Sequence, residues 1–249
     1  MTEQLRFADS GEAADLAAFL GRLVHYDRAA AVRLQGAPPT AEAVGEDGGA
    51  LGVFGRPPSF EVLAVRTVRL AVPVTAPLDV TVSAGELLEA VDEASARAVV
   101  PGPVTGPPWT GVLPPRGGWR QLPGLPAPEA IAQVLAASVA EFRARDEALP
   151  AQHRTRSERD RIGREIWSRT LGDTELPLRV AHAAQSLGFL RPVRTTVSAP
   201  ASAGSGPGTA PVALLAAGSW LRLRTPYGSV ATRRPGATGG LGAFRVSPV

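Results

Sequence analysis

The sequence predicts an α+β protein with an N-terminal strand-helix-strands unit, a central helical block and a C-terminal antiparallel β-hairpin region. Apolar residues recur at helical spacing in residues 11–25 and over much of residues 128–187, and strand-like runs occur on either side of this second stretch. Nine of the 24 prolines fall in residues 101–128, between the two regions. With 249 residues, the chain can bury one large core or two modest ones.

These patterns divide the chain into four expected regions. They are an acidic α+β unit (1–100), a proline-rich connector (101–127), a helical block with basic antiparallel strands (128–235) and a flexible tail (236–249). The connector holds Trp109 and Trp119, which a solvated linker would hardly keep. We therefore expect the connector to lie against the folded surface. A proline-rich ligand for a partner protein is the alternative.

The first helix is expected over residues 11–25, with Ser10 as its N-cap and Leu16, Leu20 and Leu23 on its apolar face. Strands are expected on both sides of it, at residues 5–7, 30–34, 50–54, 60–72 and 79–82. The last of these strands runs into a second helix, expected over residues 84–98.

One of these strands, at residues 60–72, carries a charged residue among apolar ones. Val62, Ala64 and others alternate with Arg66. Because successive side chains of a strand point to opposite sides, this pattern places one face of the strand outward.

In the second half, helices are expected at residues 128–149, 154–170 and 178–187, the last closed by Gly188. Strands are expected at residues 118–122, 192–198, 212–217, 220–225 and 228–233. Residues 199–211 are rich in Ala, Ser, Gly and Pro, which is typical of a flexible linker.

Residues 1–95 resemble one subdomain of a bacterial DNA sliding clamp. The resemblance rests on the order strand, helix, strands, and it is closest at VTVSAGELLEAV (residues 80–91), where a strand enters a Leu-rich helix. It implies a curved sheet backed by helices, in a ring or a ring-like pair, and no catalysis. The chain departs from clamps because residues 128–187 have no counterpart there, and because the first helix offers only Arg22 as a basic residue.

The chain as a whole also resembles an uncharacterised family of proteins common in actinobacterial genomes. All 26 basic residues are arginine, Lys, Asn and Cys are missing, and only three residues are Ile, as expected from a GC-rich genome. Without Cys, the chain has no disulfide, no thiol nucleophile and no cysteine-ligated zinc. Without Lys, it has no P-loop lysine and no Schiff base.

Charge is distributed unevenly along the chain. Residues 1–100 carry 14 acidic and 8 basic side chains, residues 101–175 carry 9 and 10, and residues 176–249 carry eight arginines and no acid. The three parts therefore hold −6, +1 and +8, within a net charge of +3. Such asymmetry is typical of a face that meets a polyanion.

The segment WLRLRTPYGSVATRR (residues 220–234) is the strongest candidate for such a face. Strand alternation and a turn gather four arginines and two aromatic residues there: Arg222, Arg224, Arg233, Arg234, Trp220 and Tyr227. Guanidinium groups bind phosphate oxygens through paired hydrogen bonds, and aromatic rings stack on bases. We predict a nucleic-acid-binding hairpin, with DNA the favoured ligand and with Arg179, Arg191 and Arg194 as secondary contacts. A solvated sheet face whose arginines pair with N-terminal acids is the alternative.

The helices upstream of the hairpin suggest a winged helix-turn-helix. Residues 154–164, residues 178–187 and the hairpin follow the order of a winged helix-turn-helix, in which the second helix would offer Arg179, His182, Gln185 and Ser186 to a groove. The apolar residues of that helix also fit a core helix.

The segment at residues 154–169 looks basic, but most of its arginines stand four residues from acids. The pairs are Arg154/Glu158, Arg156/Asp160, Arg161/Glu165 and Glu165/Arg169. Opposite charges at this spacing meet on one side of a helix, so the sequence predicts a self-neutralised solvent helix.

No catalytic constellation is recognised in the sequence. His25, His153 and His182 lie far apart, without metal-ligand spacing, and no nucleophile-elbow or dinucleotide motif occurs. We expect a non-enzymatic protein without a cofactor or metal.

Two other functions remain open, a protein–protein adaptor and an enzyme with an unrecognised base. The adaptor would dock its basic part on an acidic protein, or on the acidic half of another copy as a self-associating scaffold. No signal peptide or membrane segment is visible, which predicts a cytoplasmic protein without a membrane partner.

Overall fold

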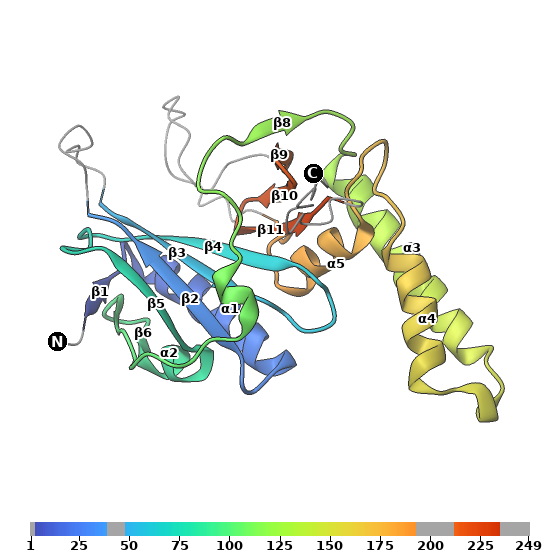
Figure 1. Cartoon of the computed structure of the whole chain (residues 1–249), viewed down its shortest axis with the longest axis horizontal. Coiled ribbons are helices and arrows are strands. Elements are labelled where there is room, and N and C mark those ends of the chain that lie inside the picture. The colour runs from blue at the N-terminus through green and yellow to red at the C-terminus, as the bar shows by residue number, and fades with distance from the viewer. Residues whose placement is uncertain (1–2, 39–47, 193–211, 235–249) are drawn as a thin grey trace, which may run out of the picture.

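The computed structural model describes residues 3–38, 48–192 and 212–234 and shows an α+β fold (Figure 1). The elements up to the connector are β1 (Gln4–Arg6), α1 (Ser10–Tyr26), β2 (Ala31–Gly36), β3 (Ala50–Gly55), β4 (Leu63–Arg69), β5 (Leu78–Ser83), α2 (Ala84–Ala90), β6 (Val91–Asp92) and β7 (Arg97–Val99). The elements from the connector onward are η2 (Pro108–Gly111), β8 (Arg120–Leu122), α3 (Pro128–Glu147), η3 (Ala151–His153), α4 (Arg156–Trp167), α5 (Leu178–Ser186), β9 (Ala213–Ala217), β10 (Trp220–Thr225) and β11 (Gly228–Arg233).

An eight-stranded antiparallel sheet in the order β5-β2-β3-β4-β11-β10-β9-β8 forms the centre of the fold, and β1-β7-β6 form a smaller sheet. The large sheet contains strands from both ends of the chain. They meet where β4 pairs with β11, with Val65 opposite Ser229 and Leu63 opposite Ala231. The acidic unit and the basic strands therefore share one sheet.

Helices α1, α2 and α5 cover one face of this sheet, which we call the helix face. The main core lies between these helices and the sheet. Leu20, Leu34, Leu221 and Val230 are fully buried there. The opposite face, which we call the open face, carries the connector. Trp109, Leu113 and Trp119 of the connector pack against Leu63, Trp220 and Ala231 of β4, β10 and β11.

Helix α1 begins one residue earlier than the sequence indicated. Its N-cap is Asp9, whose carboxylate accepts a hydrogen bond from the backbone N–H of Glu12 at 2.8 Å, so the prediction of Ser10 as N-cap is wrong. Both residue types can cap a helix, but the Asp9 carboxylate also pairs with Arg69 at 3.0 Å, which holds it in place.

The prediction that Arg66 marks an outward face is wrong. Arg66 is only 6% exposed and points to the helix face, where it meets Glu12 and Asp15 of α1. Arg66 stands two and four residues from Ala64 and Val62, so alternation itself places all three on one face of the strand, and a buried cation can lie there because it has anionic partners.

Helix α2 is shorter than the predicted helix over residues 84–98. It ends at Ala90, and β6 and β7 then form a small hairpin. Asp92 builds the turn, because its Oδ1 accepts hydrogen bonds from the backbone N–H groups of Ala94 and Ser95. Ala96 follows with a φ of 52°, which a helix cannot contain.

Helices α3 and α4 form an antiparallel pair that projects from the rest of the molecule (Figure 1). Of the four ion pairs predicted within α4, Arg161–Glu165 (2.7 Å) and Arg156–Asp160 (3.8 Å) form. The other two predicted pairs are wrong, because both arginines contact residues of α3 instead. Arg169 pairs with Glu141, and Arg154 donates to the carbonyl oxygen of Glu147.

In the C-terminal part, β10 and β11 have the predicted bounds and α5 ends one residue early. The predicted strand at residues 192–198, the linker at 199–211 and the tail at 236–249 lie almost entirely outside the described residues.

Candidate nucleic-acid interface

The structure divides the predicted contact residues among several places. Arg222 and Arg224 lie together, whereas Arg233 and Trp220 have other neighbours. Three further arginines are paired with acids: Arg191 with Asp15, Arg179 with Glu61 at 4.0 Å, and Arg234 with Glu175 at 3.7 Å. Arg194 lies outside the described residues.

Trp220 is buried beneath the connector and is only 8% exposed. The guanidinium of Arg233 lies 4.3 Å from the centre of its ring and donates a hydrogen bond to Ser219 at 2.5 Å. Trp220 is therefore largely covered, and its contacts stabilise the packing of the connector on the sheet.

Tyr227 holds the tip of the hairpin to the rest of the protein. The guanidinium of Arg191 lies 3.7 Å from the centre of its ring, and its hydroxyl donates to the carbonyl oxygen of Pro192 at 3.2 Å. Its own carbonyl oxygen accepts from Arg66 at 2.7 Å. The Tyr227 ring is thus already stacked on a cation and acts here as an anchor for the turn.

Arg222 and Arg224 project from the same side of β10, because residues two apart on a strand share a face. Both are partly buried on the open face. Arg222 donates to the hydroxyl of Ser229 at 2.7 Å and lies 5.5 Å from the centre of the Trp119 ring. Within the described parts of the chain, neither guanidinium has a carboxylate at salt-bridge distance, and the buried Nε of Arg224 has no hydrogen-bond partner.

The electrostatics of this pair are unfavourable without a counter-charge. Burial, and then the positive charge of Arg224, lower the pKa of Arg222 from its usual value. Arginine nevertheless stays protonated in proteins. Two neighbouring, partly desolvated cations are stabilised by an anion placed between them, so this pair is chemically suited to bind a phosphate group.

Two pockets adjoin Arg222 and together form a groove. At the hairpin tip, a pocket of about 350 Å³ is lined by four arginines and two carboxylates: Arg66, Arg69, Arg222, Arg224, Glu12 and Asp15. A second pocket, of about 340 Å³, extends over β3 toward Phe54 and Arg116. Both pockets are lined by Val65, Thr67 and Arg222, so they adjoin.

The first pocket exists because β4 extends beyond the end of the neighbouring strand β11. Strand β11 begins at Gly228 and pairs with β4 only as far as Val65, so β4 continues beside the hairpin turn without a strand partner on that side until the N–H of Ala8 donates to the carbonyl oxygen of Arg69 at 3.0 Å. Gly228 is required at the turn, because a Cβ there would lie 2.7 Å from the ring of Phe189.

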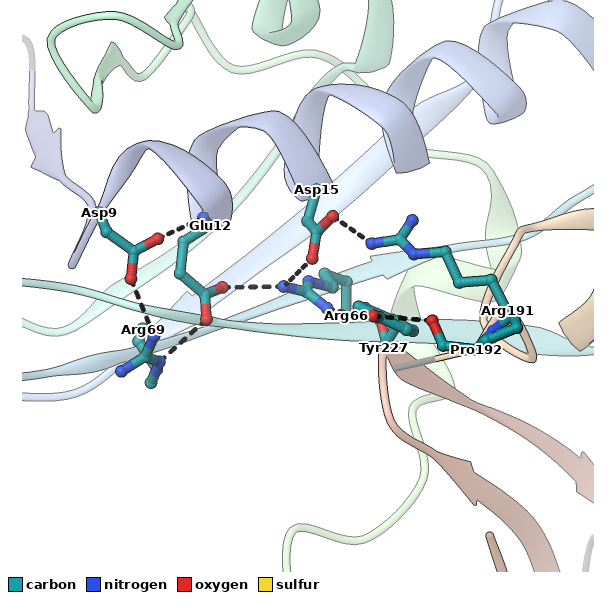
Figure 2. A network of polar contacts seen from close by, with 8 residues as sticks. All are labelled: Asp9, Glu12, Asp15, Arg66, Arg69, Arg191, Pro192 and Tyr227. Atoms are coloured by element: carbon teal, nitrogen blue, oxygen red, sulfur yellow. Dashed lines mark hydrogen bonds and ion pairs between the residues drawn. The ribbon is translucent and has the colours of Figure 1, made fainter. Parts of the chain in front are cut away.

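The carboxylates of this pocket are occupied by other arginines (Figure 2). Glu12 accepts from Arg66 at 2.8 Å and from Arg69 at 2.9 Å. Asp15 pairs with Arg191 and lies 3.4 Å from Arg66. Since neither carboxylate reaches Arg222 or Arg224, the lining keeps a net charge of +2, from four arginines and two acids.

Sequence reasoning missed this ionic network. Asp9, Glu12 and Asp15 recur every three residues, which places them on one side of α1, and this spacing was the available signal. Their partners Arg66 and Arg69 are distant in sequence, and no local pattern connects them to the helix. Arg116 of the connector was missed for the same reason, since only folding brings it to the groove.

The winged-helix hypothesis is wrong, because α5 is a core helix. It packs against β11 and β10 on the helix face, and Val180, Ala181, Ala183 and Ala184 are fully buried. His182 is stacked on Trp167, with ring centres 4.1 Å apart, so it is not presented to a groove.

Residues 3–38, 48–192 and 212–234 hold neither a metal-ligand cluster nor a membrane-spanning helix. Within these ranges, no three acidic or histidine side chains converge as metal ligands would. No helix in the same ranges combines the length and apolar character that crossing a membrane requires.

Two families of domains match the chain in succession. Residues 1–111 match a domain of unknown function (DUF8010), and residues 114–237 match another domain of unknown function (DUF8185). The boundary between the two matches falls in the connector. Neither a curated protein nor a solved structure matches the chain.

Proposed function

We propose that this protein is a non-enzymatic accessory protein that binds nucleic acid, with DNA the favoured ligand, through phosphate contacts at Arg222 and Arg224. The observation that carries the proposal is the pair of partly buried guanidiniums without an acidic partner in the described residues. The other charged groups around the hairpin tip are already paired. A phosphate would supply the missing counter-charge and accept the hydrogen bonds that Arg224 does not make.

The composition of the groove supports binding in place of catalysis. The residues that line its two pockets include no histidine, and their two carboxylates, Glu12 and Asp15, are engaged by arginines. Because guanidinium donors occupy the oxygens of these carboxylates, neither is presented to a substrate as a general base would be.

Salt-dependent binding of labelled oligonucleotides, followed by fluorescence anisotropy, tests the proposal. With one phosphate held between Arg222 and Arg224 and a second at Arg116, log K should fall against log salt with a slope of about −1.4 for a single strand and about −1.8 for B-form DNA. The double variant Arg222→Gln/Arg224→Gln should lose most of its affinity.

The matched control is Arg233→Gln, on the same hairpin. It removes one charge near Trp220, away from the two pockets of the groove. Arg222→Gln alone should weaken binding several-fold, whereas Arg233→Gln should leave it nearly unchanged. Equal losses in the two single variants would mean that binding reflects overall charge, and the proposed site would be rejected.

A further inference from the structure

The second pocket of the groove contains an aromatic side chain next to the phosphate-binding arginines. Phe54 lies on the open face of β3, is partly exposed, and lines the pocket together with Gln35, Gly52 and Arg116. At about 340 Å³, the pocket falls within the roughly 300–1,000 Å³ typical of small-molecule sites.

Gly52 makes room for the Phe54 ring. A Cβ at position 52 would lie 3.1 Å from Cε2 and 3.5 Å from Cζ of Phe54, so the ring leans along the strand over the glycine. An aromatic ring that leans along a sheet in this way can offer a flat surface to a planar ligand.

The sheet register sets the distance between this ring and the cations. Phe54 lies opposite Val65, and Val65 lies opposite Ser229, the residue whose hydroxyl Arg222 contacts. Two strand spacings, about 10 Å, therefore separate the backbone of Phe54 from that of Ser229, where the guanidinium of Arg222 is held. A single nucleotide can span this distance, with its base on the ring and its phosphate on the arginine.

We infer that the groove binds single-stranded nucleic acid, with one unpaired base stacked on Phe54 and the adjoining phosphate held by Arg222 and Arg224. This inference rests on the proposed function. A base in a duplex is stacked and paired, so it cannot lie flat on Phe54. Pro114 and Pro115 of the connector line the pocket together with Phe54.

The test compares three labelled ligands of equal length: a mixed-sequence single strand, the same strand with stable abasic units in place of its nucleotides, and a blunt duplex. The wild-type protein should bind the single strand about 5- to 100-fold more tightly than the abasic strand, the range expected for one aromatic–base stack. The duplex should bind more weakly than the single strand.

Phe54→Leu is the diagnostic variant, because it keeps an apolar side chain and removes the aromatic ring. It should lower the affinity for the base-containing strand to that for the abasic strand, and it should leave the abasic affinity unchanged. Arg222→Gln/Arg224→Gln should weaken both strands alike. Circular dichroism and a urea titration verify that each variant is folded.

The outcomes separate the inference from the proposed function. If base-containing and abasic strands bind equally, if the duplex binds most tightly, or if Phe54→Leu has no effect, the base-stacking inference is overturned and phosphate binding stands. If no ligand binds at low salt, the proposed function itself is rejected.

Discussion

The repulsion between Arg222 and Arg224 can be measured directly as a coupling free energy. Same-face residues two apart on a strand are separated by about 7 Å. At an effective dielectric constant of about 20, two unit charges at that distance repel by about 2 kcal/mol. Both side chains are only partly buried, so solvent screening should reduce this to about 1 kcal/mol in the unliganded protein.

A double-mutant cycle with Arg222→Gln, Arg224→Gln and the double variant isolates this energy from the lost Ser229 hydrogen bond. Each single variant relieves the repulsion, but the double variant can relieve it only once. The double variant should therefore be about 1 kcal/mol less stable than the sum of the single effects, as measured by urea unfolding. The discrepancy should shrink as salt or phosphate is added, because both screen the pair.

The cycle has a clear negative outcome. Effects that add to within about 0.3 kcal/mol would show that the two guanidiniums do not repel each other measurably, and the argument for an anion site would fail. The same cycle between Arg222 and Arg161, which lies on the projecting helix α4, should be additive and serves as the control.

Three further predictions concern stability. Arg66→Met should cost about 3 kcal/mol in urea unfolding, because it removes the buried cation that pairs with the partly buried Glu12 and Asp15. Arg69→Gln at a half-exposed site should cost under about 1 kcal/mol, and similar costs for the two would refute the network around Arg66. Burial lowers the pKa of His182, so the unfolded chain binds a proton at this residue more readily than the folded protein does. The free energy of unfolding should therefore fall as the pH drops below the usual histidine pKa of 6.5. His182→Phe should lessen this loss, and an unchanged pH profile of stability in that variant would contradict the prediction. Gly228→Ala should lower the free energy of unfolding by about 1–3 kcal/mol, because the added Cβ overlaps the Phe189 ring. Adding Phe189→Leu to this variant should recover part of the lost stability, which thermal unfolding can measure.

Helices and strands whose bounds depend on contacts between residues close in sequence were mostly predicted from the sequence. The hairpin strands β10 and β11 were predicted with their observed bounds, because side-chain alternation and a proline-containing turn are local signals. Helix α1 was predicted to within one residue at each end for the same reason. The predicted helix over residues 84–98 was too long, because the turn built by Asp92 interrupts an otherwise helix-compatible run.

The sequence alone determined the elements of this α+β fold and the excess of positive charge in its last third. It could not determine which arginines keep that charge available, because the deciding partners are remote: Arg191 meets Asp15 176 positions away, and Arg66 reaches Tyr227 across 161. The packing of α1 on β4 and the pairing of β4 with β11 engaged some cations and left Arg222 and Arg224 without an acid in the described residues. Tertiary structure decides this because ion pairing depends on distances of a few ångströms and on burial, and both arise only when distant segments pack together.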